Sequence, residues 1–257
     1  MKPASVWSGD LPKPNYKMPR FSAKIFVGGV PWNVEECTLL NAFRYYGPCH
    51  VEWPTRSSRS KQLIDEGKPT GYVYIAFKNE MSVSLLLLDC IQTCATNLGE
   101  YFFSMRTGKF DGACRKVEII PWIFSDTVYS LPYSHGLRYD SWHEDSNTVF
   151  VGALHGLITA SALATIMEET FGGIIMRVTI NTDKYNYPIG SGHVTFADNA
   201  SYNRAIKARF LVIRTSKFVK KIQIDPYKVP EKQLCEQCCQ CSCHEISKKF
   251  INFFSNC

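Results

Sequence analysis

One pattern of structural elements occurs twice in this chain, and this repeat constrains the fold more than any other feature. Each copy begins with a short apolar strand that has a phenylalanine at its centre, at residues 24–29 and 148–154, and the two phenylalanines lie 124 residues apart, at positions 26 and 150. In both copies the hydrophobic periodicity predicts strand, helix, strand, strand, helix, strand. The first copy has one further strand before its last. A repeat of this length indicates two copies of one domain.

The predicted elements and boundaries follow from this periodicity together with the glycine and proline positions. In the first copy we expect strands at 24–29, 51–53, 71–77, 101–105 and 117–122, with helices at 35–45 and 81–91. In the second we expect strands at 148–154, 175–180, 190–196 and 218–225, with helices at 160–171 and 201–210. The chain is thus divided into a flexible lead-in (1–21), a first domain (22–124), a linker (125–146), a second domain (147–228) and a cysteine-rich tail (234–257). The fold class is α+β, with a four-stranded antiparallel sheet and two helices on one of its faces in each domain.

The alternation of side chains along the strands decides which residues lie on the sheet face that no helix covers. Phe26, Tyr72 and Tyr74 have the parity that places three rings on this face of the first domain. Exposed aromatic rings are unfavourable without a partner, and nucleic-acid bases stack well on them. We therefore predict a surface for single-stranded nucleic acid, with edge hydrophobes or a protein-binding patch as alternatives. Trp122 shares the parity, and it either extends the stacking surface or caps the linker.

The second domain has only one ring, Phe150, at an equivalent position. Hydrogen-bonding and basic side chains take the place of the other rings on its uncovered face: Arg177, Asn181, His193, Lys217, Lys221 and Gln223. The formal charge of the chain is +6, and nine Lys or Arg against two acidic residues lie within 204–232. This concentration favours a polyanionic partner, although a solvated polar face is the alternative for any single residue. We expect this domain to bind more weakly alone than the first domain does.

Two segments of the first domain, Ile25-Phe-Val-Gly-Gly-Val30 and Thr70-Gly-Tyr-Val-Tyr-Ile-Ala-Phe77, resemble the paired signature strands of the RNA-recognition motif. Thr70 stands where that motif usually has Lys or Arg. Longer segments resemble cytoplasmic polyadenylation element-binding proteins, namely 28–32, 51–54, 120–122, 150–156, 182–192 and 217–227. His193 departs from the arginine that is usual in that family, so we expect one charged contact fewer here, because histidine is mostly neutral at cytosolic pH.

This resemblance implies two ferredoxin-like RNA-recognition motifs that together bind U-rich single-stranded elements, UUUUAU and its variants, in messenger RNA 3′ untranslated regions. It also implies control of poly(A) tail length and translation, together with polyadenylation or translation-control proteins as partners. We expect a monomer in the cytoplasm, and also in the nucleus and in ribonucleoprotein granules. A protein-interaction scaffold with the same fold, or a general single-stranded RNA binder in splicing, are the alternative functions.

The cysteine-rich tail opens with Cys235 and Cys238, whose two-residue spacing allows both thiolates to bind one zinc ion. The family resemblance implies a C-terminal zinc-binding domain here, and this pair matches its beginning, but the later spacing departs from it. Cys243, His244 and Cys257 are candidates for the remaining ligands of at most one zinc ion. A disordered, reactive tail is the alternative. We expect no other cofactor.

Two classes of function are excluded by the absence of their signatures. The sequence has no glycine-rich phosphate loop and no nucleophile elbow, so we expect no enzymatic activity. No apolar stretch approaches the roughly 18 residues that a membrane-spanning helix requires, and we expect no membrane partner.

Overall fold

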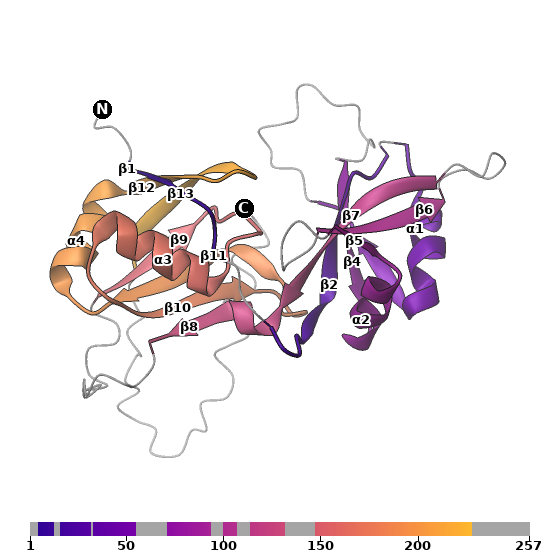
Figure 1. Cartoon of the computed structure of the whole chain (residues 1–257), viewed down its shortest axis with the longest axis horizontal. Coiled ribbons are helices and arrows are strands. Elements are labelled where there is room, and N and C mark those ends of the chain that lie inside the picture. The colour runs from indigo at the N-terminus through magenta and orange to yellow at the C-terminus, as the bar shows by residue number, and fades with distance from the viewer. Residues whose placement is uncertain are drawn as a thin grey trace, which may run out of the picture. The chain divides into compact units, whose positions relative to one another are not determined.

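The computed structural model describes residues 5–12, 16–31, 33–54, 71–93, 100–106, 114–131 and 147–227. These residues form two β-sheets, each with two α-helices (Figure 1). Within the described residues no helix has both the length and the apolar character needed to cross a membrane.

The sheet of the first domain has six strands in the order β3-β4-β2-β7-β6-β5. Its elements in chain order are β2 (Phe21–Gly28), α1 (Glu36–Phe43), the 3-10 helix η1 (Arg44–Tyr46), β3 (Cys49–Glu52), β4 (Tyr72–Phe77), α2 (Met81–Leu88), β5 (Ile91–Thr93), β6 (Glu100–Arg106) and β7 (Cys114–Ile123). The four strands β3, β4, β2 and β7 form the expected antiparallel sheet. Helix α2 is shorter than we expected, because Ile91 already pairs with Phe102 as part of β5.

The core of the first domain lies between its sheet and its two helices. Inward side chains of β2 and β4 alternate with outward ones, as the sequence predicts for a sheet that is covered on one face. The fully buried members of this core include Ile25, Val27, Val73, Ile75, Leu39, Phe43, Val83 and Leu86. The opposite face of the same strands is not covered by these helices.

The sheet of the second domain has seven strands in the order β1-β12-β13-β9-β11-β10-β8. Its elements are β8 (Val128–Ser130), which follows the 3-10 helix η3 (Phe124–Thr127), and then β9 (Thr148–Gly152), α3 (Ala160–Phe171), β10 (Ile175–Thr182), β11 (Pro188–Phe196), α4 (Asn199–Ala208), β12 (Phe210–Arg214) and β13 (Val219–Pro226). Both helices start at a side-chain cap, because Thr159 accepts a hydrogen bond from the amide of Ala162 and Asp198 from that of Ser201. Phe210, which we expected to end a helix, begins β12.

The lead-in contributes a strand to the second domain, which the sequence pattern did not predict. β1 (Ser5–Ser8) pairs in parallel with β12. Trp7 is buried at 7% exposure, and its indole N–H donates a hydrogen bond of 2.6 Å to Glu169 of α3. Our expectation of a flexible lead-in is therefore wrong for Ser5–Ser8. Burial of the indole ring and pairing along the sheet edge outweigh the flexibility that the nearby prolines indicate.

The segment that we expected to be a linker also contributes an edge strand. β8 pairs antiparallel with β10, with Tyr129 opposite Val178. Edge strands of three or four residues are too short to show a period in the sequence. The described part of the chain therefore contains more sheet than four strands per domain.

Candidate nucleic-acid interface

The three aromatic rings predicted for the first domain lie together on its uncovered face. Phe26 of β2 is opposite Tyr74 of β4, and Gly28 is opposite Tyr72. The ring centres of Phe26 and Tyr72 are 5.2 Å apart with an interplanar angle of 24°, whereas Phe26 and Tyr74 meet edge to face at 5.8 Å and 74°. All three side chains are partly exposed. The cluster is therefore a surface on which bases can stack.

Two further strands extend this face beyond the cluster. On β7, Ile120 lies opposite Phe26 and Glu118 lies opposite Gly28. On β6, Phe102 lies opposite Glu118, and the amine of Lys116 is 5.9 Å from the centre of the Phe102 ring. We did not predict these residues, although the alternation along β7 was sufficient to find Glu118 and Ile120.

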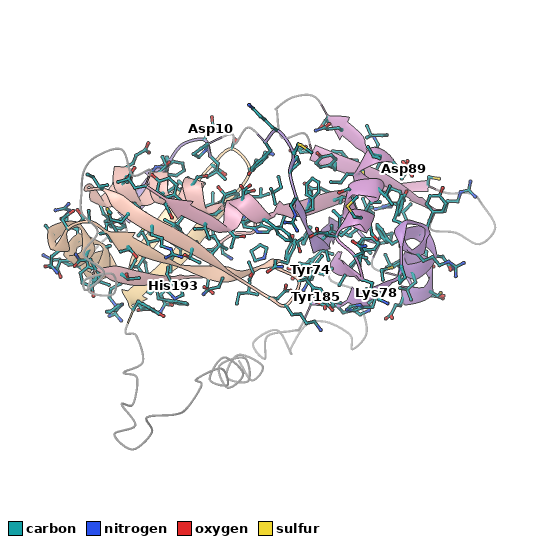
Figure 2. All side chains as sticks on the ribbon, turned by 90° about the horizontal axis from the view of Figure 1, so that it is seen from below. Asp10, Tyr74, Lys78, Asp89, Tyr185 and His193 are labelled. Carbon is teal, nitrogen blue, oxygen red and sulfur yellow. The ribbon has the colours of Figure 1, made fainter. Side chains whose placement is uncertain are left out.

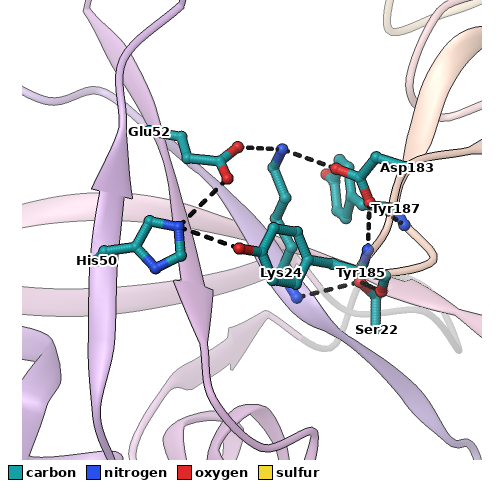
Figure 3. Close-up of polar contacts among 7 residues, drawn as sticks. All are labelled: Ser22, Lys24, His50, Glu52, Asp183, Tyr185 and Tyr187. Atoms are coloured by element: carbon teal, nitrogen blue, oxygen red, sulfur yellow. Dashed lines mark hydrogen bonds and ion pairs between the residues drawn. The ribbon is translucent and has the colours of Figure 1, made fainter. Parts of the chain in front are cut away.

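A lysine at one end of the ring cluster joins the two domains. The Nζ atom of Lys24 lies 2.5 Å from Glu52 of β3 and 2.9 Å from Asp183 in the loop between β10 and β11 (Figure 3). Burial would lower the pKa of Lys24, but the hydrogen bonds and charges of these two carboxylates outweigh it and raise the pKa. Burial would likewise raise the pKa of Glu52, but Lys24 and then His50 lower it. No pattern in the sequence indicates this pairing.

The loop between β10 and β11 carries two tyrosines to the same place. Its shape is set by Asp183, whose Oδ1 accepts the amide hydrogens of Tyr185 at 2.8 Å and Tyr187 at 3.0 Å. The carbonyl of Tyr185 accepts a hydrogen bond of 2.7 Å from the hydroxyl of Ser22. The hydroxyl of Tyr185 lies 3.2 Å from Nε2 of His50. These contacts hold the loop against strands β2 and β3 of the first domain.

The loop covers part of the predicted stacking surface. The ring of Tyr187, itself buried, meets Tyr74 edge to face at 5.7 Å. The amine of Lys24 lies 4.8 Å from the ring centre of Tyr74 and 5.8 Å from that of Tyr185. These two tyrosines are labelled in Figure 2. Tyr74 is therefore engaged by the second domain, and Phe26 also packs against the hydrophobic cluster that contains Tyr187.

Trp122 does not extend the stacking surface in this structure. Its side chain is buried at 4% exposure, and its indole N–H donates a hydrogen bond of 3.1 Å to Thr127. It packs within the hydrophobic cluster that includes Trp7 and the core of the second domain. The parity argument fails here because a neighbouring segment of the same chain covers the end of β7. The alternative, a tryptophan that caps the linker, is the better description.

The second domain has a smaller aromatic cluster on its uncovered face. His193 of β11 lies opposite Phe150 of β9, with ring centres 5.7 Å apart. The ring centre of Tyr227, a residue that we did not predict, lies 4.4 Å from that of His193. Burial lowers the pKa of His193, so this position contributes a neutral ring rather than a charge at neutral pH.

The predicted polar residues of the second domain are distributed around this cluster. Arg177 is exposed on β10, and the amide of Asn181 donates a hydrogen bond of 2.9 Å to Ser191. Gln223 of β13 donates a hydrogen bond of 2.6 Å to Asp225, which lies opposite Phe150. These amides can exchange their present partners for a base.

The two predicted lysines differ in their surroundings. Lys221 is on β13, with its amine 4.2 Å from the ring centre of Phe210. Lys217 lies in the turn before β13 rather than on the strand, and its amine forms an exposed ion pair of 3.0 Å with Glu100 of β6. Lys217 therefore lies next to the extended face of the first domain.

The predicted zinc ligands Cys235, Cys238, Cys243, His244 and Cys257 lie outside the described residues. Within the described ranges, no group of three or more His, Cys, Asp or Glu side chains is arranged to hold a metal ion.

In both domains, aromatic rings lie on two neighbouring strands of the sheet: β2 and β4 in the first domain, and β9 and β11 in the second. This arrangement defines a protein with tandem RNA-recognition motifs. The family described as RNA recognition motif matches residues 22–121. Cytoplasmic polyadenylation element-binding protein 1 of Carassius auratus is 44% identical over 236 residues, which cover 91% of this chain and 40% of that protein. Cytoplasmic polyadenylation element-binding protein 3 of Caenorhabditis remanei is 42% identical over 238 residues, which cover 87% of this chain and 30% of that protein.

The translational regulator orb2 of Drosophila melanogaster is 33% identical over 236 residues, with 91% of this chain and 30% of that protein covered. The chain belongs to the cytoplasmic polyadenylation element-binding protein family. It spans two fifths or less of the length of these relatives. Among solved structures, a Sex-lethal protein–RNA complex titled "SXL-LETHAL PROTEIN/RNA COMPLEX" aligns with a TM-score of 0.28 and 18% identity, over 80% of this chain and 99% of that chain.

Proposed function

We propose that the chain binds U-rich single-stranded elements in the 3′ untranslated regions of messenger RNAs and thereby regulates poly(A) tail length and translation. The observation that carries this proposal is the cluster of Phe26, Tyr72 and Tyr74 on the uncovered face of the first domain. The names of the relatives support it, because they describe proteins that bind cytoplasmic polyadenylation elements and one that regulates translation.

Stacking provides affinity with little choice of base, because every base has a flat aromatic face. Phe26 and Tyr72 therefore hold bases of the strand, and neighbouring hydrogen-bonding groups select among them. In the second domain the amides of Asn181 and Gln223 can exchange their protein partners for base edges. Arg177 and Lys221 supply positive charge for the phosphates.

The contacts of Lys24 and the β10–β11 loop support binding by both domains together. Asp183, Tyr185 and Tyr187 belong to the second domain but contact strands of the first. An RNA strand that is bound to one domain is then held close to the other domain. The effective concentration of the second domain near that RNA is therefore high. The two domains together should bind more tightly than either face alone.

The experiment measures binding of the complete chain to RNA that contains UUUUAU, and to the same RNA with cytidines in place of the uridines. Variants of the complete chain are used in place of isolated domains, because β1 pairs with the second domain although it precedes the first. Removal of the rings (Phe26→Ala with Tyr72→Ala) and of the second-domain charges (Arg177→Ala with Lys221→Ala) should each weaken binding. Equal affinity of wild type for the two RNAs would contradict the proposed U-rich preference.

We also propose that the tail binds at most one zinc ion, through Cys235 and Cys238, and that no other cofactor is needed. Elemental analysis of the dialysed chain decides this point: about one zinc per chain should fall to none in a variant with both cysteines replaced by serine. Two tightly held ions would contradict it.

We propose that the partners of the chain are polyadenylation or translation-control proteins. We also propose that the chain is a monomer in the cytoplasm, and that it is present in the nucleus and in ribonucleoprotein granules as well.

A further inference from the structure

A glutamate lies within the sheet face that carries the three rings. Glu118 of β7 pairs with Gly28 of β2 on one side and with Phe102 of β6 on the other. Its neighbours Val117 and Ile119 are buried at 0% and 1% exposure, so alternation places Glu118 on the uncovered side of the sheet. A carboxylate at this place repels the phosphates of a bound strand. It therefore weakens general affinity, and its presence calls for a more specific role.

The carboxylate of Glu118 and the ring of Phe26 meet above Gly28. A β-carbon built on Gly28 would lie 2.9 Å from Cε1 of Phe26 and 3.5 Å from Oε2 of Glu118. Both groups therefore border the same small space, which glycine leaves open because it has no side chain. A base that stacks on Phe26 and extends over Gly28 presents its edge to the carboxylate.

The surroundings of this carboxylate favour a ligand that donates a hydrogen bond. Burial, and then the negative charge of Glu100, raise the pKa of Glu118, and Lys217 acts in the opposite direction. The charged form is thus less well stabilised here than in water. A donor supplied by a ligand would stabilise that form, since an ionised carboxylate only accepts hydrogen bonds.

We propose that Glu118 accepts a hydrogen bond from N3–H of a uracil that stacks on Phe26. In uracil, N3–H is the donor of the Watson–Crick edge and lies between two carbonyl groups. The contact adds base reading to a stacking surface that alone accepts every base. This inference rests on the proposed function, because that function makes uracil the principal base of the ligand.

The test combines a protein variant with a modified base. Binding of wild type and of Glu118→Ala is measured, in the complete chain, with UUUUAU-containing RNAs in which one uridine at a time is replaced by 3-methyluridine, which lacks N3–H. At the position next to Glu118, the methyl group should weaken wild-type binding by roughly tenfold more than it weakens binding of the variant. At the other positions the methyl group should have the same effect on both proteins.

Two further variants separate the hydrogen bond from charge and from folding. Glu118→Gln keeps an acceptor oxygen and should retain the sensitivity to methylation. Glu100→Ala removes a negative charge from the neighbouring strand and should raise the affinity for all of these RNAs alike, with the methylation pattern unchanged. Equal effects of methylation on wild type and Glu118→Ala at every position would overturn the inference. Failure of wild type to bind the unmodified RNA would instead overturn the proposed function, and this inference with it.

Discussion

Lys24 and Asp183 are 159 residues apart in the sequence, yet they form an ion pair of 2.9 Å with side-chain exposures of only 11% and 22%. The same amine also lies 2.5 Å from Glu52. One lysine thus balances two carboxylates that come from different domains. A partly buried pair of this kind contributes little when it is complete, but loss of one partner leaves the others desolvated without compensation.

Replacement of Lys24 by methionine should therefore lower the free energy of unfolding by about 1–3 kcal/mol, because two half-buried carboxylates lose their common donor. Asp183→Asn should have a smaller effect, since Glu52 remains to pair with Lys24. Chemical denaturation of wild type, both single variants and the double variant gives the coupling energy. Lys184→Met, an exposed change next to Asp183, is the matched control. A coupling energy near zero would show that the ion pair does not contribute to stability.

The coupling between Lys24 and Glu52 should depend on pH in a predictable direction. Since the folded protein lowers the pKa of Glu52 from 4.5, this contribution is complete above that value and is lost as pH falls through the lower folded pKa. The folded protein raises the pKa of Lys24 from 10.5, so its contribution is complete below that value and is lost as pH rises through the higher folded pKa. A double-mutant cycle of Lys24→Met and Glu52→Gln, measured by chemical denaturation at several pH values, should give a constant coupling energy between about pH 5 and pH 10. A marked decline near neutral pH would be inconsistent with this pair.

Stacking should dominate the affinity for RNA. Phe26→Ala or Tyr72→Ala should each weaken binding to U-rich RNA by about 1–3 kcal/mol, as expected when one base–aromatic stack is removed. The fold should persist, since neither ring belongs to the core of the first domain. Tyr45→Ala is a matched control, because Tyr45 is 83% exposed in η1, outside the sheet. Titrations followed by fluorescence anisotropy measure the effect, and normal binding by both folded variants would rule out this stacking surface.

The part of the site that the sequence predicted well depends on local geometry. The positions of Phe26, Tyr72 and Tyr74 follow from the two-residue period of adjacent strands, and the structure places their rings in contact. The same period places Phe150 opposite His193. Periodicity within one strand is a local property, so one sequence is sufficient to detect it.

The features that the sequence did not predict depend on distant segments. Trp122 has an outward parity but is buried by chain that packs over the end of β7. Tyr187 lies in a polar loop, and nothing near it in the sequence indicates the ring of Tyr74 as its neighbour. β1 and β8 are too short to show a period, and each becomes a strand only because the sheet of the second domain offers an edge.

Trp7 provides a direct test of the N-terminal strand. Trp7→Ala removes a buried ring from the contact with α3 and should destabilise the protein by about 3–5 kcal/mol. Trp7→Phe keeps an aromatic ring but removes the hydrogen bond to Glu169, so it should have a smaller effect. Thermal unfolding followed by circular dichroism compares the three proteins. If Trp7→Ala were as stable as wild type, β1 would not be part of the second-domain fold in solution.

The lysines of the β12–β13 hairpin should contribute to affinity without contributing to base choice. Lys217 and Lys221 are exposed, and a lysine that binds a phosphate releases a condensed counterion without reading the base. Replacement of both by alanine should therefore weaken binding to U-rich and C-substituted RNA by the same factor. In a plot of log affinity against log salt concentration, the slope should become shallower by about 1.4, because each phosphate of a single strand that is no longer neutralised accounts for about 0.7.

The double variant also distinguishes phosphate binding from a structural effect of the hairpin. Lys217 is held by Glu100 in an exposed ion pair, and exposed pairs of this kind contribute about 0–1 kcal/mol to stability, so removal of the pair should leave the melting temperature nearly unchanged. Arg44→Ala, on an exposed residue of η1 away from the sheet face, is the control for a general decrease in positive charge, and it should leave the salt slope almost unaltered. A change in the ratio of U-rich to C-substituted binding, with the slope unaltered, would assign these lysines to base recognition instead. A shallower slope with a constant ratio is the result that phosphate binding requires, because only interactions with the backbone are blind to sequence and sensitive to salt.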